Sequence, residues 1–259
     1  MSEFKLSASK LRTFKACRRK YELAYIELLE PIQKEEALEM GSNYHSNIEK
    51  LLKNEVKDEE IKNVDEAKII AMTNAFEKYI LPKLPKIKET EIKFEFVLDE
   101  EKEYKINGII DALTEDGVVV EHKSSGTALD EKYIDRLNWD DQVPIYMLAT
   151  GTNFCYYTVC QKPTIRQKQN EDLNDFCNRC IEWYDENTEQ KIGIFKVYRT
   201  IEELEEKRKE LKMMCDEISN TKNFYKNQNN CSIMSCPYAS ICLNYDSSIE
   251  PIGFKKKEV

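Results

Sequence analysis

The segment from Gly108 to Ser125 places two carboxylates and one lysine among aliphatic residues. Asp111, Glu121 and Lys123 interrupt runs of Ile, Leu and Val. Neighbouring carboxylates in a sheet repel each other unless a cation lies between them. Oxygen ligands of this kind suit Mg²⁺ or Mn²⁺, with water and phosphate completing the coordination shell. The alternative interpretation is a solvent-facing salt bridge between Lys123 and one of the two acids.

The turn between the two predicted strands decides whether these side chains can meet. A two-residue turn at Asp116 and Gly117 would turn Asp111 away from Glu121. A three-residue loop that ends at Gly117, with this glycine in the left-handed conformation, instead sets Asp111 directly opposite Glu121. Residues two apart on a strand share a face, so Lys123 then joins both acids. We predict this second register.

Hydrophobic periodicity predicts that helices precede and follow a group of strands. Ser7 or Ser9 is expected to cap the first helix and Ser42 the second. From Glu91 the period changes to two, which indicates strands, so we predict an α/β fold with a mixed β-sheet flanked by helices. The predicted helices are 6–29, 42–53, 66–80, 141–150, 171–186 and 201–219, and the predicted strands are 91–99, 104–114, 118–124 and 153–163.

The composition combines an acidic chain with a basic N-terminal segment. The formal net charge of −9 over 259 residues argues against a protein that simply coats nucleic acid. Residues 1–25 nevertheless hold seven Lys or Arg against two Glu, which predicts a local nucleic-acid contact there. The sequence lacks a secretory signal pattern and an apolar run long enough to span a bilayer. We therefore expect a cytoplasmic location and no membrane contact.

Several motifs occur in the order typical of one nuclease family. Residues 41–45 read GSNYH, Asp111 is followed by EHK at 121–123, and residues 142–146 read QVPIY. These resemble the G-x-x-x-H, D…E-x-K and Q-x-x-x-Y motifs of the PD-(D/E)XK nuclease superfamily, in its RecB-like or AddB-like branch. The N-terminal and C-terminal segments are also similar, and residues 156–168 resemble phage and prophage members.

The resemblance implies a restriction-endonuclease-like core within a single domain. Its expected parts are an N-terminal helical part at 1–90, a catalytic sheet core at 91–165, and C-terminal helices with a cysteine clasp at 166–259. It also implies a role for each matching residue. The implied metal ligands are Asp111, Glu121, His45 and the backbone carbonyl of His122, and Lys123 is the implied catalytic lysine beside Asp111 and Glu121. Gln142 and Tyr146 are DNA-binding candidates that would contact either the DNA strand or Lys123. Arg18 and Arg19 are further DNA-binding candidates, and Glu95 is a supporting acid.

Four of the nine cysteines match a cluster-binding pattern of the same nucleases. In those relatives, one N-terminal and three C-terminal cysteines hold a 4Fe-4S cluster that clasps the two ends of the chain. Zn²⁺ on the same thiolates is the alternative. A separate C-x-x-C at Cys177 and Cys180 is predicted to be a pair of packing residues. The implied cluster ligands are Cys17, Cys231, Cys236 and Cys242.

The resemblance as a whole implies a Mg²⁺- or Mn²⁺-dependent deoxyribonuclease with a structural 4Fe-4S cluster. An exonuclease acting on single strands or duplex ends, in DNA recombination or repair, is the expected activity. DNA is the expected substrate, and a recombinase, a helicase or a single-strand annealing protein is the expected partner. Two alternatives are a CRISPR-adaptation-type nuclease that trims DNA before integration and a non-catalytic DNA-end-binding subunit of a recombination complex. A third is a cluster-based redox or regulatory protein.

Overall fold

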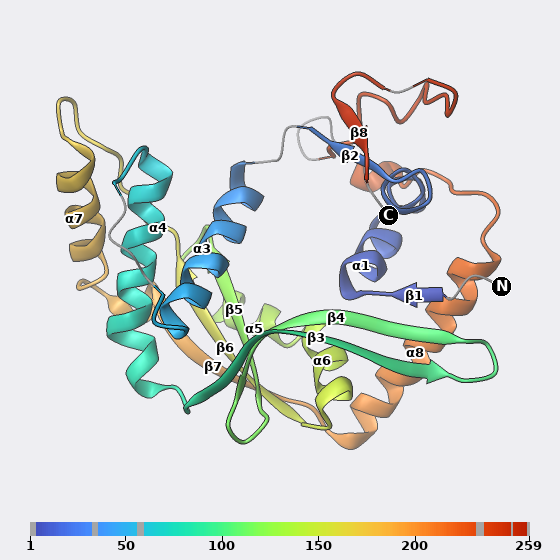
Figure 1. Cartoon of the computed structure of the whole chain (residues 1–259), viewed down its shortest axis with the longest axis horizontal. Helices are drawn as coiled ribbons and strands as arrows, with labels where there is room; N and C mark the ends of the chain where they lie inside the picture. The colour runs from blue at the N-terminus through green and yellow to red at the C-terminus, as the bar shows by residue number, and fades with distance from the viewer. Residues whose placement is uncertain (1–3, 33–35, 56–59, 232–235, 250, 258–259) are drawn as a thin grey trace. The chain divides into compact units, whose positions relative to one another are not determined.

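The computed structural model describes residues 4–32, 36–55, 60–231, 236–249 and 251–257 (Figure 1). The chain forms two compact units, each assembled from separate segments. Unit 1 contains Met1–Glu35, Glu95–Gly108 and Glu205–Val259, and unit 2 contains Glu36–Phe94 and Ile109–Leu204. Two long strands each contribute residues to both units, and the expected division into three consecutive parts stays a prediction.

A mixed sheet forms the centre of unit 2. Strand β4 is antiparallel to β5, β5 is parallel to β6, and β6 is antiparallel to β7. Strand β3 pairs with β4 on its other edge. This arrangement confirms the predicted mixed α/β class. The strands are β3 (Ile87–Asp99), β4 (Tyr104–Thr114), β5 (Val119–Ser125), β6 (Phe154–Gln161) and β7 (Ile192–Tyr198).

Helices cover both faces of strand β5. His122 contacts Phe76, which begins the π-helical turn Phe76–Ile80 after α4, whereas the adjacent residue Lys123 contacts Gln142 at the start of α6. Successive strand residues point to opposite faces, so the two contacts lie on opposite sides of the sheet. The helices of unit 2 are α3 (Glu36–Leu52), α4 (Val64–Ala75), α5 (Glu131–Leu137), α6 (Gln142–Thr150) and α7 (Leu173–Trp183).

Unit 1 joins the N-terminal helices to the C-terminal segment. Strand β2 pairs antiparallel with β8, and β1 pairs parallel with the first residues of β4. Ser7 caps α1 through its side chain, as one of the two predicted caps. The elements are β1 (Phe4–Leu6), α1 (Ala8–Ala16), α2 (Arg18–Tyr21), the π-helical turn Glu22–Ile26, β2 (Leu29–Pro31), α8 (Ile201–Asn220), whose first residues belong to unit 2, and β8 (Phe254–Lys256).

The hairpin between β4 and β5 has the predicted three-residue loop. Gly117 adopts a φ of +76°, and its backbone N–H donates to the Thr114 carbonyl at 2.9 Å. The Thr114 N–H donates to the Val118 carbonyl at 3.0 Å, and Ala112 pairs with Val120. Continued by one residue, this register sets Asp111 opposite Glu121.

Two helix predictions are wrong. Ser42 does not cap a helix, because α3 begins six residues earlier, at Glu36, and Ser42 lies within it. The first predicted helix is interrupted at Cys17, which is extended (φ −164°, ψ 118°) and separates α1 from α2. The sequence also did not predict α5, β1, β2, β7 or β8. Within the described part of the chain, no helix combines the length and apolar character needed to cross a bilayer.

Candidate active site

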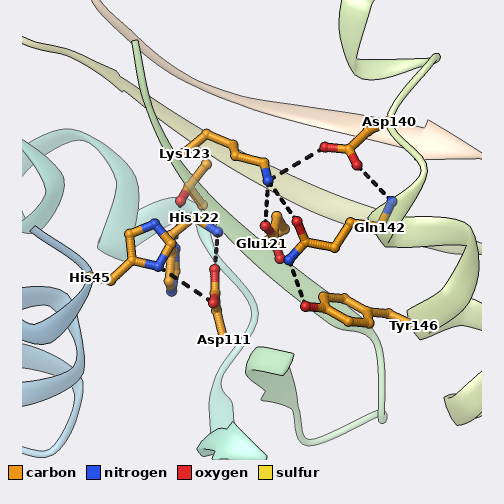
Figure 2. Close-up of polar contacts among 9 residues, drawn as sticks. His45, Asp111, Glu121, His122, Lys123, Asp140, Gln142 and Tyr146 are labelled. Atoms are coloured by element: carbon orange, nitrogen blue, oxygen red, sulfur yellow. Dashed lines mark hydrogen bonds and ion pairs between the residues drawn. The ribbon is translucent and has the colours of Figure 1, made fainter. Parts of the chain in front are cut away.

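Strands β4 and β5 bring the two predicted acids together in unit 2. The Asp111 Oδ2 accepts a hydrogen bond from the backbone N–H of His122 at 2.8 Å. Glu121 is almost completely buried, with 1% of its surface exposed. His122 itself points to the other face, where its Nδ1 lies 2.6 Å from Thr158 Oγ1. The hairpin therefore holds both carboxylates on one face (Figure 2), and the contact of His122 with Thr158 holds the strand on the other.

Lys123 lies at the centre of a polar network on that face. Its Nζ donates to Glu121 Oε1 at 2.6 Å and to Gln142 Oε1 at 3.2 Å, and lies 3.4 Å from Asp140 Oδ2. The attraction of Glu121 and Asp140 outweighs burial and raises the pKa of Lys123 to about 12. The lysine is therefore an ammonium at neutral pH, and its donors are directed at three acceptors (Figure 2).

Helix α6 supplies one side of this network through its first turn. The Gln142 N–H donates to Asp140 Oδ1 at 2.7 Å, and the Gln142 side-chain amide donates to Tyr146 Oη at 2.6 Å. Pro144 lies within the first turn, where a helix tolerates it. Tyr146 is 4% exposed and packs against Phe94. Its buried ring positions Gln142 through this hydrogen bond, and a contact of Tyr146 with DNA stays a prediction.

Helix α3 brings His45 to the other side of Asp111. The His45 Nδ1 lies 3.5 Å from Asp111 Oδ1. Burial lowers the pKa of His45, but the hydrogen bond and charge of Asp111 outweigh it and raise the pKa overall. Burial raises the pKa of Asp111, whereas the same contact with His45 lowers it more. Each side chain thus favours the charged form of the other.

Glu121 has a buried carboxylate oxygen that could contact a cation. Its Oε2 is buried and has no hydrogen-bond partner among the described residues. Burial and then the charge of Asp111 raise the pKa of Glu121 to about 8. In the described ranges, no three His, Cys, Asp or Glu side chains already stand close enough to hold a metal ion. The oxygen-rich donor set of Asp111 and Glu121, with His45 alongside, still fits a hard divalent cation.

A different acid from the predicted one lies near Asp111. The carboxylate of Glu95 belongs to unit 1, where it forms ion pairs with Lys5 at 2.7 Å and Lys105 at 3.1 Å. Glu91, four residues earlier on β3, has a left-handed φ of 53°. Burial and then the charge of Asp111 raise the pKa of Glu91. The structure thus places Glu91, and not Glu95, within electrostatic reach of the hairpin acids.

The two arginines predicted to contact DNA have partners within unit 1. The Arg18 guanidinium lies 4.6 Å from the centre of the Phe14 ring and 2.6 Å from a Glu217 carboxylate oxygen. Arg19 forms an ion pair with Glu22. Both arginines therefore stabilise the packing of the N-terminal helices, and their contact with DNA stays a prediction.

The cysteines predicted to bind a cluster lie in unit 1, and two of them meet at Asn227. The Asn227 N–H donates to Cys17 Sγ at 3.4 Å, and Cys231 Sγ donates to the Asn227 carbonyl at 3.3 Å. Cys17 is accessible because the break between α1 and α2 turns the chain at this residue. One asparagine backbone thus connects the N-terminal cysteine to the first C-terminal one.

Cys242 is electrostatically coupled to the same pair. Burial raises the pKa of Cys242, nearby basic side chains lower it, and the thiols of Cys17 and Cys231 raise it further. Cys236 packs against the small apolar cluster of unit 1. Residues 232–235, between two of the predicted ligands, lie outside the described residues. By contrast, Cys177 and Cys180 are buried in unit 2, as predicted for packing residues.

Asp140 contacts Lys123 but was not among the site residues predicted from the sequence. One oxygen of the Asp140 side chain accepts a hydrogen bond from the Gln142 N–H at the start of α6. Its second oxygen, however, faces Lys123. A pair of aspartates directly before the Q-x-x-x-Y motif was the available signal, but the ion pair depends on a contact across 17 residues of chain.

Comparisons with known proteins identify the family of this chain. The model of the PD-(D/E)XK nuclease superfamily matches residues 5–243. The crystal structure of SSO0001 has a TM-score of 0.51 and 15% identity, covering 94% of this chain and 88% of that one. A phage-related exonuclease from Haemophilus somnus 129PT has a TM-score of 0.42 and 14% identity, covering 84% and 96% respectively. No curated protein matches significantly. Because the family match spans nearly the whole chain, this protein belongs to the PD-(D/E)XK nuclease superfamily.

Proposed function

We propose that the protein is a divalent-metal-dependent deoxyribonuclease that acts as an exonuclease on single strands or duplex ends. The observation that carries this proposal is the buried Glu121 Oε2, which has no hydrogen-bond partner in the described part of the chain and lies on the same face as Asp111 and Lys123. Burying one carboxylate beside another costs free energy, because the two negative charges repel each other away from water. A purely structural hairpin would gain nothing from this arrangement. A cation between the two acids removes that cost.

The ligands that would hold Mg²⁺ or Mn²⁺ are Asp111, Glu121, His45 and the carbonyl of His122. When bound, such an ion activates water as a nucleophile and neutralises phosphate charge. Water loses a proton to solvent as its oxygen forms a bond to phosphorus, and the bond between phosphorus and the 3′ oxygen breaks. This oxygen takes up a proton, so the products are a 3′-hydroxyl and a 5′-phosphate.

Lys123 has the contacts expected of a residue that stabilises the developing negative charge. Its ammonium is held by Glu121, Gln142 and Asp140, so it requires little reorganisation during the reaction. Gln142 is in turn fixed by Tyr146. The role of the Q-x-x-x-Y pair in this proposal is therefore to orient the lysine, with the amide of Gln142 as the group in contact.

We also propose that Cys17, Cys231, Cys236 and Cys242 hold a 4Fe-4S cluster. The supporting observations are the shared contact of Cys17 and Cys231 with Asn227 and the electrostatic coupling of Cys242 to both thiols. Four thiolates suit iron–sulfur chemistry, and a cluster would link the first helices of unit 1 to its C-terminal segment. Zn²⁺ on the same thiolates is the competing assignment.

Digestion of end-labelled DNA tests the catalytic proposal. Single-stranded and blunt duplex substrates, labelled at either end, are incubated with Mg²⁺ or Mn²⁺, and Asp111→Ala is compared with the wild type. Stepwise shortening that requires the metal and disappears in the variant supports an exonuclease. Asp116→Asn, in the exposed hairpin loop, is the matched control. Equal cleavage by Asp111→Ala would refute the site, and no cleavage by the wild type would favour the non-catalytic DNA-end-binding role.

Anaerobic purification tests the cluster independently of activity. A brown protein with iron and acid-labile sulfide, and loss of both in Cys17→Ser, is the expected result. Cys215→Ser is the matched control, because this thiol is buried in unit 1 and is not among the proposed ligands. A colourless preparation with stoichiometric zinc would replace iron by zinc and leave the nuclease proposal untouched.

A further inference from the structure

The turn that joins α5 to α6 presents an exposed tryptophan on a fixed backbone. We call residues 136–140 the Trp139 turn. Trp139 is 87% exposed, whereas Leu137 beneath it is 5% exposed. The Trp139 N–H donates to the Arg136 carbonyl at 3.0 Å, and the Asp140 N–H donates to the Leu137 carbonyl at 3.4 Å. The indole therefore projects from a hydrogen-bonded turn and not from a loose loop.

The Trp139 turn borders the candidate active site directly. Asp140, the next residue, ends 3.4 Å from the Lys123 ammonium and also receives the first N–H of α6. Only one peptide bond therefore separates the exposed indole from a residue in contact with the proposed catalytic lysine. The close-up shows Asp140 between the lysine and the start of the helix (Figure 2).

Arginine side chains accompany the indole. The Arg199 guanidinium donates to the carbonyl of Asn138, the residue before Trp139. Arg136, at the other end of the turn, has an exposed side chain. Arg136 and Arg199 thus place two cationic side chains at the turn, whereas Asp140 and Asp141 follow the indole in the sequence. Stacking, supported by phosphate contacts, is the binding mode that suits this combination.

We propose that the Trp139 turn is a stacking platform for an unpaired base of single-stranded DNA beside the scissile phosphate. The proposal rests on the proposed function and specifies its substrate class. A base inside a duplex is already stacked on both faces, so only an unpaired strand or a frayed end can present one to the indole. Arg199 and Arg136 then face the phosphates on either side of the stacked nucleotide.

Trp139 also provides what Tyr146 does not. The tyrosine ring of the Q-x-x-x-Y motif is buried against Phe94, with no face open to a base. Trp139 lies seven residues earlier and is the exposed aromatic residue at the start of the same helix. Tyr146 thereby helps to orient Lys123 through Gln142, and Trp139 contacts the base.

Binding without metal tests the platform separately from cleavage. The wild type and variants are titrated with a fluorescein-labelled thymidine oligonucleotide in EDTA. Trp139→Ala is expected to weaken affinity about fivefold to a hundredfold, the range found when one base–aromatic stack is removed. Trp139→Phe should recover most of the affinity. Met213→Ala, which truncates another exposed apolar side chain, should leave it unchanged. For blunt duplex DNA, the difference in affinity between the wild type and Trp139→Ala should be much smaller than for the single strand.

Intrinsic fluorescence provides a direct readout of the stack. The chain has two tryptophans, so Trp183→Phe leaves Trp139 as the single reporter. Unlabelled thymidine oligonucleotide should quench that reporter, because a stacked base contacts the indole.

Unchanged affinity in Trp139→Ala, no quenching, or no single-strand binding by the wild type would each overturn the platform. Metal-dependent cleavage alongside any of these results would leave the nuclease proposal standing. Conversely, quenching and a loss of affinity in Trp139→Ala, without cleavage by the wild type under any metal, would support the platform and end the proposed catalytic function.

Discussion

The buried carboxyl of Glu121 predicts that the metal-free protein loses stability as the pH rises. Burial and the charge of Asp111 raise its pKa from 4.5 to about 8. Between these values the folded chain keeps a proton that the unfolded chain has lost. The free energy of unfolding therefore receives the full contribution of the protonated group below about pH 4.5 and loses it as the pH rises through 8. The slope is about 1.4 kcal/mol per pH unit, or ~3 kcal/mol between pH 5.5 and 7.5.

Urea unfolding in EDTA at these two pH values measures the effect. The wild type is compared with Glu121→Gln, which keeps the shape of the side chain and cannot ionise. The variant should lack the fall of about 3 kcal/mol that Glu121 contributes in the wild type. Glu182→Gln, which removes an exposed acid from α7, is the control and should retain the wild-type dependence. If the free energy of unfolding of Glu121→Gln falls as much as that of the wild type, ionisation of Glu121 is not what destabilises the folded protein.

Adding a divalent cation at the higher pH extends this test. Mg²⁺ at a hundred times its dissociation constant should stabilise the wild type by about 2.7 kcal/mol, because the ion binds the folded protein only. Glu121→Gln should gain much less, since it lacks one of the two carboxylates. Equal stabilisation of both proteins would show that the ion binds somewhere other than beside Glu121.

Other perturbations of the hairpin and its network have distinct expected results. Lys123→Met should slow single-turnover cleavage about a hundredfold to a thousandfold while DNA affinity in EDTA stays unchanged. Asp140→Asn keeps an acceptor for helix α6 but removes the charge beside the lysine, so kcat should fall about tenfold with KM unchanged, whereas Asp130→Asn, at the cap of α5, should alter neither. Gly117→Ala, at a φ of +76°, should cost about 1 kcal/mol in urea unfolding, whereas Gly126→Ala has open space without a left-handed φ and should not destabilise.

The hairpin that carries the site could be predicted from the sequence because its signals are local. Gly117 permits the left-handed turn, and the alternation of side chains along a strand then fixes which residues face each other. The start of α6 could likewise be predicted from Pro144, because a helix tolerates a proline only in its first turn. In both cases a few neighbouring residues determine the geometry.

The remaining differences come from tertiary contacts. Helix α3 extends before Ser42 because Met40, Tyr44 and Ile48 follow each other at intervals of four and bury one continuous face. Such packing outweighs the preference of serine for a helix start. The ion pair of Asp140 with Lys123 depends on the crossover between β5 and β6, which no local pattern encodes.

The parallel pairing of β5 with β6 also sets the order in which the site can form during folding. The two strands of the β4–β5 hairpin close through a three-residue loop, whereas Val119 and its partner Cys155 must first bring together the ends of the whole α5–α6 crossover. Closing the longer loop costs more chain entropy, so we expect the hairpin to gain amide protection first in pulsed hydrogen exchange. A nascent chain would then bring its two acids together before the helix that orients Lys123 arrives, and the protein becomes competent for catalysis only at the end of folding.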